Sequence, residues 1–316
     1  MGMDKNETSH YFKDICFKYS LKVKYFDNPC LFLKAQKNKI EISGAKNANL
    51  RDGVSITKFL FWLKNNFKRK RISEISAQNK LEDFRKLNSN YKFPSFSTIS
   101  GSGPNSAIIH YRATIKSNRV LKKGDLYLVD SGGQYHYGTT DVTRTVSLEN
   151  KSRNIKNIYT RVLKGHIAVS NFKIKKNTTG SIVDKNARKF LKKIRLDYPH
   201  GTGHGVGYFL NVHEGPHSLS QKNRIYLKNG MILSNEPGYY REGSFGIRIE
   251  NLVYIRKNKF KELTMAPIDK DLIDKKILNS SEISWLNNYH KLVKKCLDKF
   301  MNKSEKIQLA KACSPI

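Results

Sequence analysis

The feature that most constrains the fold is the order in which helical and strand patterns follow one another along the chain. Apolar residues at helical spacing come first, followed by β-prone runs broken by glycine and proline. Two further helical patterns, a second set of glycine-punctuated strand patterns and a last helix complete the order. The expected segments are, in sequence, 56–67, 72–87, 95–148, 151–172, 180–195, 203–257 and 280–300.

This order predicts the fold class α+β, with a curved, mostly antiparallel sheet covered by helices, rather than a wound βαβ array. Residues 125–148, DLYLVDSGGQYHYGTTDVTRTVSL, are expected to form two strands joined by a tight glycine-rich connection. No G-x-G-x-x-G opens a helix after a strand, so the sequence does not indicate a dinucleotide site.

The first part of the chain differs from the rest. It predicts a short helix over 10–22 and then an extended piece that ends in NPCLFLKAQ. The patterns become regular from about residue 37. We therefore expect residues 1–36 to be an N-terminal stub and residues 37–316 to be one folded domain, a division that 316 residues permit.

The formal net charge of +33 has two interpretations. One is nucleic-acid binding, and the densest basic run is Lys68-Arg69-Lys70-Arg71. The other is a general drift in composition towards lysine, which we favour because no recognisable RNA- or DNA-binding signature accompanies the run. We expect no specific nucleic-acid partner, only a salt-sensitive attraction to polyanions.

The sequence also bears on location. No apolar run approaches the roughly 18 residues that span a bilayer, so we expect no membrane partner. The opening residues lack the apolar region of a signal peptide. The four cysteines are scattered without C-x-x-C spacing, which fits a reduced setting. A cytoplasmic location is the resulting expectation.

Four carboxylates and one imidazole fall in the strand-rich segments. A lone residue of this kind is usually a cap, a turn residue or part of a solvated face, but the five together are placed to converge on one face of the sheet. Strand alternation also sets Arg248 and Glu250 on the face opposite Ile247 and Ile249. The five residues are Asp130, Asp141, His204, Glu236 and Glu250.

A site with four clustered carboxylates predicts bound cations, because such groups cannot all remain ionised without compensation. Two divalent ions would balance the four negative charges, and two metals roughly 3.5–4 Å apart can generate a nucleophile near neutral pH. Oxygen-rich ligation with one histidine favours Mn²⁺, although Zn²⁺ or Co²⁺ could also bind.

These residues resemble the pita-bread metallopeptidase family M24, which includes methionine aminopeptidase, prolidase and aminopeptidase P. The family's ligands follow the order Asp, Asp, His, Glu, Glu, matched here by the five residues above. The strongest resemblance is to the Xaa-Pro aminopeptidase branch. It is carried by residues 101–111, 129–145, 200–216 and 235–240, and by the ending EKIQLAKACSPI.

The resemblance implies roles for individual residues. Asp141 and Glu250 would bridge two metals, and a metal-bridged hydroxide would attack the X–Pro peptide bond. His213 and His110 would contact the scissile peptide and the developing tetrahedral intermediate, and His200 would shape the pocket for proline. Glu236 would shuttle the proton to the leaving nitrogen. We also expect Arg248 to hold a carboxylate or substrate in place.

The implied activity is release of the first residue from peptides with proline at position two. Relatives of this type usually carry one or two additional N-terminal domains, and only a stub is expected here. A homodimer is one expectation for the assembly, and the shortened N-terminal part leaves the oligomeric state open. Three alternatives remain: a prolidase acting on Xaa-Pro dipeptides, a scaffold or binding protein, and an inactive copy. His217 receives no role and is expected at the surface.

Overall fold

The computed structural model describes residues 1–5 and 7–316. Within this part of the chain, eight α-helices are formed. They are α1 (His10–Lys18), α2 (Pro29–Ala35), α3 (Lys39–Asn66), α4 (Glu74–Lys86), α5 (Arg153–Ser170), α6 (Gly180–Lys192), α7 (Ser280–Leu297) and α8 (Lys303–Ala312). Four short 3-10 helices accompany them: η1 (Gly103–Ala107), η2 (Lys270–Leu272), η3 (Lys275–Ile277) and η4 (Asp298–Phe300).

The strands are short and fall mainly between α4 and α7. They are β1 (Gly2–Met3), β2 (Lys24–Tyr25), β3 (Tyr91–Pro94), β4 (Ile99–Ser102), β5 (Leu126–Ser131), β6 (Gly133–Tyr135), β7 (Gly138–Thr139), β8 (Val142–Ser147), β9 (Gly203–His204), β10 (Ser218–Leu219), β11 (Ile232–Asn235), β12 (Gly238–Arg241), β13 (Phe245–Arg248), β14 (Asn251–Arg256) and β15 (Lys259–Glu262).

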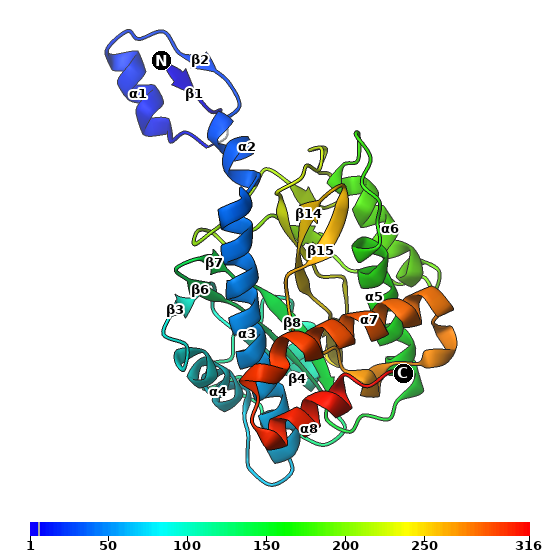
Figure 1. The fold of residues 1–316 in the computed structure, drawn as a ribbon. Helices are drawn as coiled ribbons and strands as arrows, with labels where there is room; N and C mark the ends of the chain where they lie inside the picture. The colour runs from blue at the N-terminus through cyan, green and yellow to red at the C-terminus, as the bar shows by residue number, and fades with distance from the viewer. Residues whose placement is uncertain (6) are drawn as a thin grey trace.

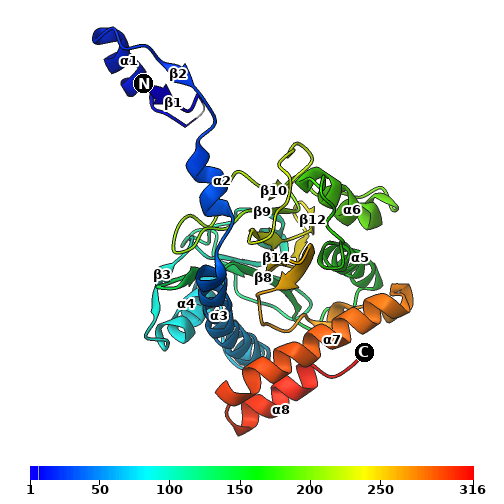
Figure 2. The same ribbon diagram turned by 45° about the horizontal axis from the view of Figure 1, so that its top comes forward.

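Most of the strands after residue 90 lie towards the middle of the molecule with helices around them (Figures 1 and 2). In one three-stranded sheet β5 pairs with β4 and β8, and in another β14 pairs with β11 and β15. Every strand pair after residue 90 is antiparallel, while β1 and β2 pair in parallel. The predicted α+β class with a mostly antiparallel sheet is confirmed.

Polar residues at the helix starts explain where the helices begin. The Asn38 side chain accepts hydrogen bonds from the N–H groups of Ile40 and Glu41, and the Glu41 carboxylate accepts one from the Asn38 N–H. This reciprocal arrangement is a capping box, which satisfies backbone donors that a helix start leaves free. Ser73 before α4 and Asn279 before α7 cap their helices in the same way.

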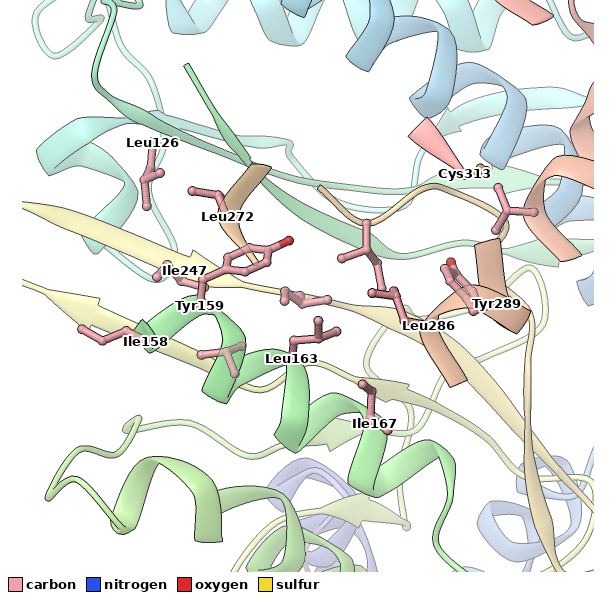
Figure 3. Close-up of a cluster of buried hydrophobic side chains, with 14 of the residues drawn as sticks. Leu126, Ile158, Tyr159, Leu163, Ile167, Ile247, Leu272, Leu286, Tyr289 and Cys313 are labelled. Atoms are coloured by element: carbon pink, nitrogen blue, oxygen red, sulfur yellow. The ribbon is translucent and has the colours of Figure 1, made fainter. Parts of the chain in front are cut away.

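The largest apolar core lies between the strands and the helices α5 and α7 (Figure 3). Ile158 and Leu163 of α5 belong to the same cluster as Ile247 of β13 and Leu286 of α7. A second core joins α3 and α4 to strands β5 and β8. Strands β5, β8 and β13, which lead to the candidate site, are thus packed against helices.

Three local predictions are wrong. Residues 29–35 form helix α2 instead of an extended piece, because the Asn28 side chain caps Cys30 N–H and Pro29 suits the first helical position. The connection between β5 and β8 is not one tight turn but contains the β6–β7 hairpin. Among residues 203–213, only Gly203–His204 forms a strand, and the rest is irregular. Helix α8 was not predicted from the sequence pattern.

The first helix and the two strands beside it stand away from the rest of the molecule (Figures 1 and 2). Several large apolar side chains there are exposed, including Phe17 at 88 %. Among residues 1–5 and 7–316, no helix combines the length and apolar character needed to cross a bilayer.

Candidate metal centre

The five candidate ligands all lie at or next to the ends of strands. Asp130 is in β5 and Asp141 immediately precedes β8. His204 ends β9, Glu236 follows β11, and Glu250 stands between β13 and β14. Because strand ends from different sheets meet at this point, residues up to 120 positions apart are brought to one place.

Three of the five offer ligand atoms that lie within 4.8 Å of one another: Asp141, His204 and Glu250. His204 Nε2 is 3.4 Å from Asp141 Oδ2 and 3.4 Å from Glu236 Oε1. Ligands bound at about 2.1 Å to one ion stand roughly 3–4 Å apart, so these separations suit a shared cation. Asp130 lies outside the group of three but lines the same cavity.

The orientation of His204 follows from its backbone surroundings. Its Nδ1 is 2.9 Å from the Gly205 carbonyl oxygen, so Nδ1 carries the proton and Nε2 presents a lone pair to the carboxylates. The His204 N–H donates to Ser234 Oγ, and the same hydroxyl donates to Glu236 Oε1, both at 2.9 Å. One serine therefore positions two candidate ligands.

Glu250 is held by two residues that the sequence interpretation did not identify. Thr143 Oγ1 donates to Glu250 Oε2 at 2.7 Å, and the Glu250 N–H donates to the Thr143 carbonyl. The fully buried Arg144 guanidinium donates to the Glu250 carbonyl and to Ala266 and Pro267 carbonyls. Both residues lie within TTDVTRT, and their closeness to Asp141 in the sequence could have indicated a role in the site.

Asp130 is oriented by Arg248, as the alternation in GIRIEN suggested. Arg248 Nη2 is 2.6 Å from Asp130 Oδ2, and its Nε donates to Thr143 Oγ1. Its Nη1 donates to the Tyr240 hydroxyl, which is also 2.8 Å from His200 Nε2. Tyr240 was not predicted as a site residue, although it ends the NEPGYY string. Arg248 therefore contacts Asp130, Thr143 and Tyr240 of the site.

The electrostatics of the site fit bound cations. Burial raises the pKa of Asp141 well above its usual range, and the neighbouring Asp130 and Glu236 raise it further. Burial also raises the pKa of Glu250, with Asp141 adding to the effect. Burial acts to raise the pKa of Glu236, but neighbouring histidines and Arg248 outweigh it and the pKa is lowered.

Two buried oxygens of the site also lack donors. No N–H or O–H group among the described residues reaches Asp130 Oδ1 or Asp141 Oδ1. Buried carboxylate oxygens normally accept hydrogen bonds or bind metal. Oxygen ligands with one imidazole suit hard or borderline divalent ions. The residues therefore fit two such ions, with Asp141, His204 and Glu250 grouped most tightly.

The three further histidines named from the sequence line the same cavity, which has a volume of about 460 Å³. The rings of His213 and His204 meet edge to face at 4.0 Å. Burial lowers the pKa of His213, with His204 contributing, and burial also lowers the pKa of His200. Both shifts favour the neutral form of the ring, and His200 Nδ1 lies 2.7 Å from the Gly201 carbonyl oxygen. His110 reaches the cavity from the loop after η1.

The prediction that His217 lies at the surface is wrong. Its side chain is buried, with 1 % exposure, and Nε2 is 2.9 Å from the Ile232 carbonyl oxygen. Burial lowers the pKa of His217 to about 4. The cavity also has a wall that sequence reasoning missed, formed by Phe96, Ser97, Ile99, Ile109, Arg112 and Val212.

Comparison with known proteins identifies the family. The model of metallopeptidase family M24 matches residues 44–257, and the model of the C-terminal region of peptidase M24 matches residues 258–316. The chain belongs to metallopeptidase family M24. All five candidate ligands and the three further histidines lie within the M24 match, and the C-terminal match contains α7 and α8.

Individual M24 relatives point to a more specific branch. The chain is 45 % identical over 279 residues to a probable Xaa-Pro aminopeptidase P from Laccaria bicolor, covering 83 % of this chain and 44 % of that protein. A crystal structure of X-prolyl aminopeptidase from Caenorhabditis elegans, described as a cytosolic enzyme with a di-nuclear active site, aligns with a TM-score of 0.89 and 38 % identity. That alignment covers 93 % of this chain and 51 % of the worm chain.

A second solved M24 structure is more distant. An Xaa-Pro dipeptidase from Bacillus anthracis aligns with a TM-score of 0.73 at 28 % identity, covering 85 % of this chain and 73 % of that one. The chain spans about half the length of the aminopeptidase relatives that it matches.

Proposed function

We propose that the chain is a metal-dependent aminopeptidase that releases the first residue from peptides with proline at position two. The observation that carries this proposal is the meeting of an Asp–Asp–His–Glu–Glu set with three further histidines in one cavity. The similarity to aminopeptidase P relatives over more than four-fifths of the chain supports the same choice.

The proposed cofactor is a pair of divalent ions, most suitably Mn²⁺. Asp130, Asp141, His204, Glu236 and Glu250 would hold them. When bound, such ions supply Lewis-acid activation of water and of the scissile carbonyl. The fit rests on the short separations around His204 and on the buried carboxylate oxygens without donors.

The protein groups around the ions would bind and orient the peptide. Its free amine would lie against the carboxylates and its scissile carbonyl against His213 and His110, whose N–H groups can donate to the developing negative charge. Glu236 is the proposed carrier of the proton to the proline nitrogen, because its lowered pKa makes it an acceptor at neutral pH. His200, fixed by Tyr240, would form the wall facing the proline ring.

The test is cleavage of Gly-Pro-Gly by the purified chain, with and without added Mn²⁺. We expect release of free glycine that depends on metal and stops with a chelator. His213→Gln should lower kcat with little change in metal content, whereas His204→Ala should remove both metal and activity. His136, which lies outside the cavity, offers a control as His136→Gln. Bound metal with no cleavage of any X-Pro peptide would refute the proposal.

A second candidate function is a prolidase, which the likeness to an Xaa-Pro dipeptidase favours. Gly-Pro run beside Gly-Pro-Gly separates the two enzymes. Preference for the tripeptide supports the aminopeptidase, and preference for the dipeptide supports the prolidase. The third candidate is a scaffold without catalysis, for which metal analysis would find neither bound nor activating metal.

The proposal includes three properties of the whole protein. Residues 37–316 form the catalytic unit and residues 1–36 an N-terminal segment, which the separate placement of α1 in Figure 1 supports. The enzyme acts in the cytoplasm, as the worm relative is described to do. It assembles as a homodimer, which a sedimentation measurement of the full chain would test.

A further inference from the structure

One basic side chain of the cavity has no partner among the residues that the structure describes. Arg112 and Arg248 are the two Lys or Arg residues that line it. Arg248 is buried and pairs with Asp130, whereas Arg112 is exposed and makes no ion pair or hydrogen bond within the described residues. A residue that is exposed and also lines a cavity lies at its opening, so Arg112 marks the mouth.

The loop that carries Arg112 is firmly anchored. Tyr111, the preceding residue, is 4 % exposed, and its hydroxyl donates to Glu74 Oε2 at 2.8 Å. Beyond Arg112, Thr114 and Ser117 close a turn through the hydrogen bond from Ser117 N–H to the Thr114 carbonyl. Tyr111 therefore points into the protein while His110 and Arg112, on either side of it, both reach the cavity.

The cavity is thus negative at its base and positive at its mouth. Asp141 and Glu250 are 4 % and 1 % exposed, so the acidic groups lie deep, whereas Arg112 lies at the surface. A peptide that enters with its ammonium group first places its other end towards the mouth. The cavity volume of about 460 Å³ falls within the range of roughly 300–1,000 Å³ that small-ligand sites have. The C-terminal end of a short peptide bound there would therefore lie near the mouth.

We propose that Arg112 forms a carboxylate-binding subsite for the residue that follows proline, an inference that rests on the proposed function. A guanidinium binds a carboxylate through two parallel hydrogen bonds, so charge and geometry both fit. The carboxylate is either the C-terminus of a tripeptide or an acidic side chain at position three. In both cases the subsite selects short or acidic substrates.

The experiment compares matched peptides in the metal-loaded full chain. Gly-Pro-Gly is set against its C-terminal amide, and Gly-Pro-Glu-amide against Gly-Pro-Gln-amide. We expect the carboxylate to raise kcat/KM by about threefold to tenfold in at least one pair, a range between an exposed ion pair and a charge-assisted hydrogen bond. The first pair reports a C-terminal carboxylate and the second an acidic side chain.

Variants then assign the effect to Arg112. Arg112→Gln should bring the carboxylate preference to within twofold of one, mainly by lowering kcat/KM for the peptides that carry the carboxylate, and Arg112→Lys should retain part of the preference. Lys116→Gln removes an exposed charge from the same loop outside the cavity and should behave like the unchanged protein. High salt should reduce the preference in the unchanged protein and in Lys116→Gln, and should change it little in Arg112→Gln.

Two outcomes would overturn the inference: a preference that persists in Arg112→Gln, or an equal loss with charged and uncharged peptides. Equilibrium binding of Gly-Pro-Gly and its amide to the metal-free chain provides a readout without turnover. If no peptide is cleaved, the proposed function fails, but an Arg112-dependent difference in dissociation constant still supports the subsite. Equal affinity for acid and amide in that measurement would refute the subsite.

Discussion

The buried ion pair between Lys37 and Glu214 allows a direct test of how the cavity wall is held. Lys37 Nζ is 2.6 Å from Glu214 Oε1, and the two side chains are 1 % and 3 % exposed. Glu214 follows His213 and donates its N–H to the Gly205 carbonyl at 2.8 Å. The pair therefore ties the segment just before α3 to the loop that carries His213.

Lys37→Met should destabilise the protein strongly, because it leaves the Glu214 carboxylate buried without its main partner. Removing one partner of a buried pair typically costs about 3–5 kcal/mol. Lys34 lies 3.6 Å from Glu214 but its side chain is 42 % exposed, so it compensates only weakly. At about 2 °C per kcal/mol for a chain of this size, the melting temperature should fall by roughly 6–10 °C.

The assay is thermal and denaturant unfolding of Lys37→Met, with Lys34→Met as the control that removes the exposed lysine. The double variant Lys37→Met/Glu214→Gln should be more stable than Lys37→Met alone, because no unpaired charge remains. Lys37→Met should also lower kcat for Gly-Pro-Gly at temperatures where it stays folded. A loss below 1 kcal/mol, or a double variant less stable than Lys37→Met, would refute this reasoning.

Three further predictions concern single residues. Asp141→Ala should abolish Mn²⁺ binding and turnover, which metal analysis and peptide cleavage measure together; full activity would contradict the site. Tyr240→Phe removes the hydroxyl shared by Arg248 and His200 and should lower kcat/KM about tenfold with an unchanged fold, as judged by circular dichroism. His290 is buried, and burial lowers its pKa to about 3. Above the unfolded pKa of about 6.5, protonation of His290 does not affect stability. As the pH falls from 6.5 towards 3, only the unfolded chain binds the proton, so the native state loses stability. The free energy of unfolding of His290→Gln should therefore rise relative to that of the unchanged protein by about 1.4 kcal/mol for each pH unit lost in that window, as measured by denaturant titration. A constant difference in unfolding free energy between pH 7 and 5 would contradict this.

The convergence of the five candidate ligands could be anticipated because each follows a pattern that is readable locally. Asp130 ends the apolar run LYLVD, and Glu236 follows MILSN. Apolar strands pack in the interior, so a carboxylate at such a strand's end lies where the interior meets solvent. The alternation around Ile247 also placed Arg248 with the acidic residues, and the Arg248–Asp130 contact at 2.6 Å agrees with that expectation.

The supporting groups could not be read in this way, because they depend on contacts between distant segments. Arg144 binds carbonyl groups more than 100 residues away, and no pattern in the sequence around it predicts these contacts. Tyr240 meets His200 across 40 residues. The helix over 29–35 was missed for a different reason: the apolar run is short, and only the cap at Asn28 indicates how it begins.

Residues 200–217, which include four histidines, show how close backbone approach gives different positions to residues that look equivalent in sequence. A Cβ on Gly203 would lie 2.0 Å from the Ser234 carbonyl oxygen, and one on Gly205 would lie 2.1 Å from the Glu214 carbonyl oxygen. Glycine at both positions lets β9 lie directly against its neighbours, and that contact turns His204 towards the carboxylates. The same packing carries His217 into the interior, where its ring bonds a backbone carbonyl instead of reaching the cavity. Gly203→Ala should therefore lower metal affinity without changing any ligand, because His204 would be displaced with its strand.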